Sequence, residues 1–229
     1  MLMRGVIKER RALLFDIDGT LADTDALHIE AFNAVFGRYG HVFDRPRAAR
    51  ELLGRSNASI GAQFLPDEPP ERRAAIMAQK EEVFRGLAAG RVEPLPGLIA
   101  LLDQAAAASI PVVAVTNAPR ANAELILQGI GIADRFRAVI IGDELLHGKP
   151  HPLPYLEGLR AAEAAPETAV AFEDSRAGIA AATAAGIVTV GMRTNLEHDD
   201  LIAAGAALSA AAFDEPELLA LLRRRLGGD

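Results

Sequence analysis

Two aspartates separated by one residue, Asp16 and Asp18, are the side chains whose spacing most directly suggests chemistry. They follow a short apolar run at 13–15, which is typical of a buried strand, and Gly19 after them favours a turn. Open α/β sheets bind ligands at the carboxyl ends of their strands, where this pair is expected. Two carboxylates this close repel unless a cation lies between them, an arrangement that suits Mg²⁺ and a phosphate. The alternative is a plain strand and turn with no chemical role.

Further polar side chains are expected at the same edge: Thr116, Asn117, Lys149, Glu173 and Asp174. The first two follow a predicted strand at 110–115, the last two follow one at 169–172, and the lysine lies in a loop between them. Any one of them could simply cap the next helix. Together they provide carboxylates for a metal ion, a hydroxyl, an amide and a cation, which is a set suited to phosphoryl transfer.

Such a set favours a reaction in two steps. One carboxylate attacks phosphorus and forms an aspartyl-phosphate, while a second carboxyl group protonates the leaving alcohol and then activates water. Two motifs for nucleotide binding do not fit. The segment 142–149 is followed by Pro150 where a phosphate-binding loop needs Ser or Thr, and 129–131 lacks the third glycine of a dinucleotide site.

The elements that would position these groups alternate between helix and strand from residue 97 onward. Predicted helices cover 97–108, 119–127, 153–164, 176–185 and 215–226, and predicted strands cover 110–115, 138–141, 169–172 and 187–190, with a weak strand near Ala207. This alternation is typical of a parallel sheet with right-handed crossovers. The sequence therefore predicts an α/β fold with a three-layer, Rossmann-like core.

The segment between the first strand and residue 90 shows no strand pattern. A helix is predicted over 25–40, ended by Gly40, and two or three more over 46–88, broken at Gly54, Gly61 and 66–70. Because the first strand must join the later sheet, this segment is expected to be a helical insert. The predicted domains are a core of 1–23 and 96–229, and a small all-helical cap of 24–95.

Two polar residues interrupt the apolar stripes of the insert. Lys80 lies between Ile76 and Val83, and His28 lies four residues before Phe32. One interpretation is that Lys80 extends to solvent and that His28 is a satisfied, partly buried histidine. The other is that both point into a cleft under the cap and hold the hydroxylated part of a substrate.

The composition limits the classes of protein that fit. The net charge is −7, and the one basic run, 223–225, is expected to be a cation cluster at the end of a helix, so nucleic-acid binding is not predicted. The sequence has no cysteine, which excludes a disulfide, a thiolate metal site and a catalytic thiol. No apolar run reaches membrane-spanning length and no signal peptide is evident, so we expect a cytoplasmic protein, a monomer, that does not bind membranes.

Four motifs in this order resemble the signatures of the haloacid dehalogenase (HAD) superfamily. They are 15–21, 115–117, 148–150 and 172–175, or FDIDGTL, VTN, GKP and FEDS. The resemblance covers almost the whole chain and implies a Rossmann-like core with a helical cap inserted after the first strand. The dehalogenases themselves lack an aspartate at the position of Asp18, so its presence favours phosphate chemistry.

The resemblance also implies roles for single residues. Asp16 would be the nucleophile and Asp18 the general acid and base, while Thr116 and Lys149 would bind the phosphoryl group with Asn117 beside them. Mg²⁺ would be held by three ligands: Asp16, the backbone carbonyl of Asp18, and Asp174. Glu173 would be a further or supporting ligand.

Within the superfamily, the segments 23–28 and 173–175 resemble the β-phosphoglucomutase branch. The segments 53–57 (which begins at Leu53), 115–120 and 149–152 resemble more closely the broad-range sugar phosphatases of this branch. This implies that His28, Lys80, Arg55 and Asn57 of the cap determine which substrate is bound. The mutase commonly has arginine where Asn57 stands, which favours hydrolysis of small sugar or polyol phosphate monoesters. The alternatives are mutase-type phosphotransfer and a sensor that binds a phosphate ligand without catalysis.

Overall fold

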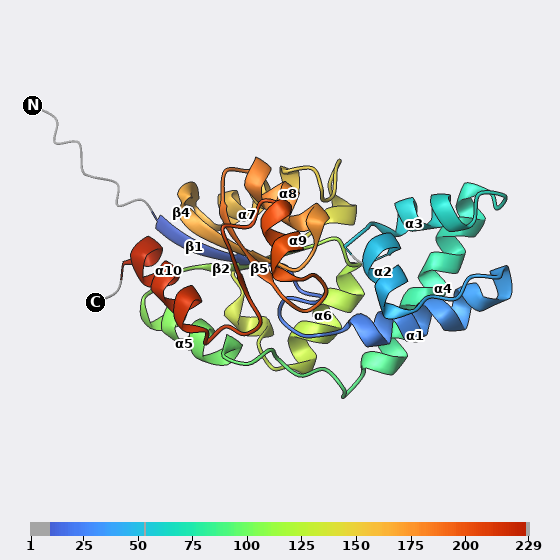
Figure 1. The fold of residues 1–229 in the computed structure, drawn as a ribbon, viewed down its shortest axis with the longest axis horizontal. Helices are drawn as coiled ribbons and strands as arrows, with labels where there is room; N and C mark the ends of the chain where they lie inside the picture. The colour runs from blue at the N-terminus through green and yellow to red at the C-terminus, as the bar shows by residue number, and fades with distance from the viewer. Residues whose placement is uncertain (1–9, 53, 228–229) are drawn as a thin grey trace, which may run out of the picture.

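The computed structural model of the protein describes residues 10–52 and 54–227. Expectations that fall on the other residues, among them Leu53 and the start of the predicted core, lie outside this part. The described residues form one parallel sheet flanked by helices, with a separate group of helices at one end (Figure 1). None of the helices within these residues is long and apolar enough to cross a membrane.

The sheet has six strands in the order β3-β2-β1-β4-β5-β6, and every neighbouring pair is parallel. The strands are β1 (Arg10–Phe15), β2 (Val112–Thr116), β3 (Ala138–Ile141), β4 (Ala164–Glu173), β5 (Val188–Met192) and β6 (Leu208–Ala210). The order reverses between β1 and β4, which is where doubly wound sheets open a crevice at the carboxyl ends of the strands. The predicted Rossmann-like fold is confirmed.

Helices cover both faces of the sheet. The helices on one face are α5 (Leu98–Ala107), α6 (Arg120–Gly129) and α10 (Pro216–Leu226), and those on the other are α7 (Leu153–Ala162), α8 (Arg176–Ala184) and α9 (His198–Ala203) (Figure 1). Strand β1 contributes side chains to the apolar cores on both faces of the sheet. Leu13 and Phe15 pack into one core, and Ala12 and Leu14 pack into the other.

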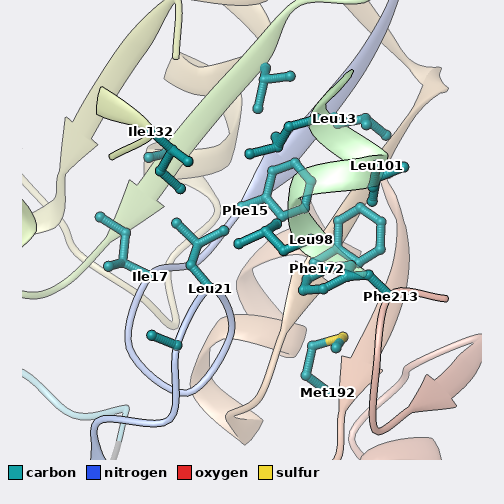
Figure 2. Packing of buried hydrophobic residues seen from close by; sticks show 14 of the residues in the cluster. Leu13, Phe15, Ile17, Leu21, Leu98, Leu101, Ile132, Phe172, Met192 and Phe213 are labelled. Atoms are coloured by element: carbon teal, nitrogen blue, oxygen red, sulfur yellow. The ribbon is translucent and has the colours of Figure 1, made fainter. Parts of the chain in front are cut away.

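Aromatic packing fixes the two central strands just before their functional residues begin. Phe15 of β1 stacks on Phe172 of β4 with ring centroids 4.5 Å apart, and Phe213 packs against both (Figure 2). Each ring is fully or almost fully buried, and such a pair adds about 0.5–1.5 kcal/mol beyond its burial. The side chains that follow, Asp16 and Glu173, therefore leave the sheet from rigid positions.

The segment after β1 is helical, as the sequence predicts. It contains α1 (Asp25–Phe36), α2 (Arg45–Glu51), α3 (Asn57–Phe64) and α4 (Pro70–Ala88), with short 3₁₀ turns η1 (Gly37–Tyr39) here and η2 (Ala133–Arg135) and η3 (Gly142–Glu144) in the core. These four helices have their own apolar cluster, which includes Phe32, Phe36, Ile60 and Met77. The boundaries at 23/24 and 95/96 stay predictions.

Two details of the helical segment differ from the prediction. The helix predicted over 25–40 is α-helical only to Phe36; η1 follows and ends at Tyr39, before Gly40, whose φ is 80°. The break predicted at Gly61 is wrong, because Gly61 lies inside α3 and faces α4, where Arg73 and Met77 approach it. A glycine that lets a neighbouring helix come close is tolerated despite its low helix propensity.

Candidate active site

The nucleophile predicted from the sequence, Asp16, is the first residue after β1. Its backbone N–H donates to the carbonyl of Phe172, 3.0 Å away, and the residue is 7% exposed. The chain then turns at Gly19, whose φ is +72° and where any side chain would collide with the Asp174 carboxylate. Glycine at this position thus allows the loop after β1 to approach the end of β4.

Lys149 joins the two central strands through three short contacts. Its Nζ donates to Asp16 Oδ1 at 2.6 Å, to Glu173 Oε1 at 2.5 Å and to the Val115 carbonyl at 2.6 Å. Burial alone would lower the pKa of this lysine, but the two carboxylates outweigh it and raise the pKa. The buried ammonium is therefore held in its charged form next to Asp16.

Glu173 is fully buried, and donors surround its carboxylate. Besides Lys149, the hydroxyl of Tyr155 donates to Oε1 at 2.7 Å and the Ser175 hydroxyl to Oε2 at 3.2 Å. A side chain at Gly178 would collide with this carboxylate, so the start of α8 leaves room for it. Because both oxygens are engaged, the contacts suit a residue that fixes Lys149 better than a direct metal ligand.

Asp174 completes a buried acidic group that could hold a cation. Oxygens of Asp16, Glu173 and Asp174 all lie within 4.8 Å of one another. Burial raises the pKa of Asp16 to about 7, even though Lys149 opposes the rise, and burial together with Asp16 and Asp25 raises the pKa of Asp174 well above its ordinary value. Ionised oxygens this close need positive charge, and a hard divalent ion with oxygen ligands fits this donor set.

Asp18 faces the helical segment rather than Lys149. Its Oδ1 accepts a hydrogen bond from the Thr24 hydroxyl at 2.7 Å and lies 3.0 Å from His28 Nε2. Burial would raise the pKa of Asp18, but His28, Thr24 and Lys80 outweigh burial and hold the pKa below its ordinary value. The loop after β1 and the helical segment thus meet at the predicted acid–base residue.

Behind His28, a buried polar chain continues into α4 and back to the core. Lys80 is 2% exposed, and its Nζ lies 3.0 Å from both His28 Nδ1 and Glu81 Oε1. The interpretation that Lys80 extends to solvent is therefore wrong. Since the ammonium can only donate, His28 Nδ1 accepts and its Nε2–H donates to Asp18. Glu81 in turn accepts from Asn122 of α6 at 2.7 Å.

Thr116 and Asn117 lie at the end of β2 and line the same cavity as Asp16. The Thr116 oxygen accepts from the Ala118 N–H at 3.0 Å, which leaves its hydroxyl proton free to donate. The Asn117 amide is already occupied, because it exchanges two hydrogen bonds with the backbone N–H and carbonyl of Lys149, at 2.9 and 3.1 Å. The Thr116 hydroxyl can therefore donate to a group bound in the cavity, while Asn117 holds the lysine loop.

Arg55 and Asn57 reach the cavity from the start of α3. The Arg55 guanidinium is bound within the helical segment itself, since it donates to the Glu51 carbonyl at 2.9 Å and to Gln63 at 2.5 Å. Burial would raise the pKa of Glu81, but Lys80 above all, together with His28 and a hydrogen bond from Asn57, holds this pKa below its ordinary value. The structure thus brings every predicted site residue except Glu173 to one cavity lining, with Glu173 buried directly beneath.

The cavity between the sheet edge and the helical segment is small. Its volume is about 80 Å³, whereas ligand pockets are usually about 300–1,000 Å³. A sugar phosphate could enter only if the two parts moved apart. In this arrangement of the two parts, little of Asp16 is exposed.

Several site residues were not predicted from the sequence. Tyr155 and Asn122 carry no strand-end signal, because each lies within a helix. Asn195 could have been found, since it follows β5 at the same carboxyl edge, and its Nδ2 donates to Asp174 Oδ2 at 2.8 Å. Asp25 begins α1 and lines the cavity, but its acidic first-turn position also suits an ordinary helix start.

The strand order is that of a doubly wound α/β sheet, and a lysine between two strand-end carboxylates is an arrangement suited to phosphoryl transfer. The family model described as haloacid dehalogenase-like hydrolase matches residues 13–192, and the chain belongs to this family. The predicted superfamily is confirmed. The prediction that the chain is a phosphoric monoester hydrolase is also confirmed at the level of the family, whose members here include a named phosphatase.

Individual relatives are similar over nearly their whole length. Protein CbbY of Rhodobacter capsulatus is 34% identical over 92% of this chain and 99% of its own. The fructose-1-phosphate phosphatase YqaB of Escherichia coli is 33% identical over 79% of this chain and 95% of its own. A mutant CbbY of Rhodobacter sphaeroides, solved in complex with xylulose-1,5-bisphosphate, is 31% identical over 90% of this chain and 96% of its own, with a TM-score of 0.78.

Proposed function

We propose that this chain is a Mg²⁺-dependent phosphatase that hydrolyses small sugar or polyol phosphate monoesters through an aspartyl-phosphate on Asp16. The observation that carries the proposal is the contact between Lys149 and Asp16 Oδ1 at 2.6 Å, beside the Asp174 carboxylate. This arrangement keeps a nucleophilic carboxylate, a cation and a metal site at one point. Relatives that act on phosphorylated carbohydrates support the class of substrate.

In the first step, the Asp16 carboxylate attacks phosphorus and the bond from phosphorus to the ester oxygen breaks. Lys149 and the Thr116 hydroxyl bind the phosphoryl oxygens, and Asn117 keeps the lysine in place. Mg²⁺ would be held by Asp16, Asp174 and the Asp18 carbonyl, and it would supply positive charge beside the transferring group. The products are an alcohol and the acyl phosphate of Asp16.

Asp18 handles the protons in both steps. A bound phosphate dianion raises the pKa of a nearby carboxyl group, which favours the protonated form needed to donate to the leaving oxygen. In the second step, the carboxylate removes a proton from the water that attacks phosphorus and releases phosphate. The hydrogen bonds from Thr24 and His28 hold this carboxylate over the cavity.

Residues 24–95 would act as a cap that opens for exchange and closes for reaction. We assign His28 and Lys80 to the hydroxylated part of the substrate, with Arg55 and Asn57 at its far end. Mutase-type phosphotransfer is less well supported, because a second phosphate needs a cation and asparagine stands at position 57, where the mutase commonly has arginine. The cytoplasmic location, the monomeric state and the absence of nucleic-acid and membrane partners stay predictions.

The test is a screen of phosphate monoesters with the protein treated with EDTA and then supplied with Mg²⁺. The proposal predicts release of inorganic phosphate from sugar or polyol phosphates only when Mg²⁺ is restored. Incubation with β-glucose 1-phosphate separates the two candidates, since a mutase accumulates glucose 6-phosphate and a phosphatase releases phosphate. Binding of esters without turnover under all these conditions would contradict both and indicate a sensor.

A further inference from the structure

Two buried oxygen atoms beside Asp174 have no hydrogen-bond donor. They are Asp25 Oδ2 and Asn195 Oδ1. Asp25 is 2% exposed and lines the cavity that also contains Asp16 and Asp174, yet the reaction described above does not use it. A buried acceptor without a donor costs about 1–3 kcal/mol, and more when it is charged. Because buried polar atoms nearly always have a hydrogen-bond partner, such an atom indicates a bound water, ion or ligand.

The Asn195 side chain lies close enough to the Asp25 carboxyl group to oppose the rise in its pKa that burial causes, but Asp25 Oδ2 and Asn195 Oδ1 themselves have no hydrogen-bond partner among the described residues. The nearest cation to Asp25 among its ion pairs is Arg45, whose NH2 is 3.9 Å from Oδ2, beyond hydrogen-bonding distance. The Asn195 amide nitrogen donates to Asp174 Oδ2 at 2.8 Å, so its amide oxygen belongs to a side chain already fixed against a predicted metal ligand. Two acceptors near the Asp174 carboxylate therefore have no donor within the described part of the chain.

The position of the two acceptors distinguishes the candidate donors. Substrate hydroxyls are assigned to His28 and Lys80, whose polar atoms contact Asp18 and each other, whereas Asn195 contacts Asp174. A Mg²⁺ ion, in contrast, keeps several of its water molecules, and these waters are strong donors that commonly bind to carboxylates and amides outside the ligand set. Water on a cation held by Asp174 would supply the missing donors.

We propose that Asp25 and Asn195 are positioning residues which accept hydrogen bonds from the water molecules of the bound Mg²⁺. This inference rests on the proposed function, because it requires the metal site. Asp25 lies at the first turn of α1, in the helical segment, whereas Asn195 follows β5 in the core. Binding of the hydrated ion would therefore also connect these two parts of the protein.

Calorimetric titration of the EDTA-treated, dialysed protein with MgCl₂ tests the inference without any turnover. Asp25→Asn should weaken Mg²⁺ binding about 10- to 100-fold, the usual effect of mutating such a partner, because it removes the charge and replaces one acceptor oxygen by a donor. Titration with CaCl₂ should show a smaller change, since Ca²⁺ gives up its waters more readily than Mg²⁺. Asp23→Asn is the matched control, because it removes the same charge 3.6 Å from Arg45 at an exposed position outside the cavity lining.

The possible results separate this inference from the proposed function. If the unaltered protein takes up no Mg²⁺, both are contradicted. If it binds Mg²⁺ and Asp25→Asn binds equally well, or if Asp23→Asn weakens binding as much as Asp25→Asn, only the inference fails. A rise in KM for phosphate esters with unchanged Mg²⁺ affinity would make Asp25 a substrate ligand instead and overturn the inference. Should Asp25→Asn fail to fold, Asn195→Ala is measured, and unchanged Mg²⁺ affinity in that variant overturns it as well.

Discussion

Replacing Lys149 by methionine should destabilise the protein strongly and in a way that depends on pH. The ammonium lies within 2.6 Å of Asp16 Oδ1 and of Glu173 Oε1, and the lysine is 6% exposed. Removing one partner of a buried ion pair costs about 3–5 kcal/mol because the other charge stays buried without compensation. Methionine is of similar size, so a cavity contributes little.

The pH dependence follows from the two carboxylates that remain. Burial raises the pKa of Asp16 to about 7 while Lys149 is present, and loss of the ammonium would raise it further. Asp16 can therefore take up a proton at about pH 6, which relieves part of the repulsion from Glu173, but less so at about pH 8. The loss of unfolding free energy should be larger at the higher pH.

Urea denaturation at both pH values measures this loss. Arg120→Met is the matched control, since Arg120 forms an exposed ion pair with Glu144, and such a pair contributes only about 0–1 kcal/mol. Glu173→Gln added to Lys149→Met should recover part of the stability, because it removes one of the unpaired charges. A loss under about 1 kcal/mol, or an equal loss at both pH values, would refute this account of the site.

Three further predictions concern the cap, the metal and the link between α4 and α6. Lys80→Ala should lower kcat/KM for a sugar phosphate at least about tenfold more than for an aryl phosphate, and equal losses would contradict its assignment to the sugar. In metal-free protein, the pKa of Asp16 and of Asp25 is about 7 in the folded state and 3.8 in the unfolded state. Their protonated forms therefore stabilise the folded state fully below pH 3.8, and this contribution to the free energy of unfolding is lost as the pH rises through about 7. Melting temperatures without metal should fall from about pH 5.5 to about pH 8, and Mg²⁺ should raise them most at the higher pH; a flat or rising profile would argue against the raised values. Asn122→Ala leaves a Glu81 oxygen without its donor and should cost about 1–3 kcal/mol in urea denaturation, whereas a neutral result would show that this contact is weak.

The sheet and its functional edge could be predicted because buried parallel strands are short, continuous apolar runs. The predicted strand at 138–141 matches β3, and the rule that ligand sites lie at strand ends located Asp16, Glu173 and Asp174. The extent of β4 could not be predicted, because Ala164 lies in the strand only through its pairing with Arg10 of β1.

Contacts between the helical segment and the core could not be predicted from the sequence. The apolar stripe around Lys80 allows its side chain either to face inward or to extend to solvent. The side chain contacts His28 because α4 packs against α1. In the same way, the sequence places Asn117 at a strand end, but its amide is used by the Lys149 backbone because the two loops meet there. Long-range pairing of this kind depends on tertiary structure and leaves no periodic signal.

The most direct test of the central claim is to trap the covalent intermediate. The protein, supplied with Mg²⁺ and a sugar phosphate that it hydrolyses, is quenched in acid during turnover, reduced with borohydride and digested for mass spectrometry. The account predicts that the aspartyl-phosphate maps to Asp16, and that Asp16→Asn abolishes both the intermediate and turnover while the protein remains folded. Phosphate release by Asp16→Asn, or an intermediate on any other residue, would contradict it.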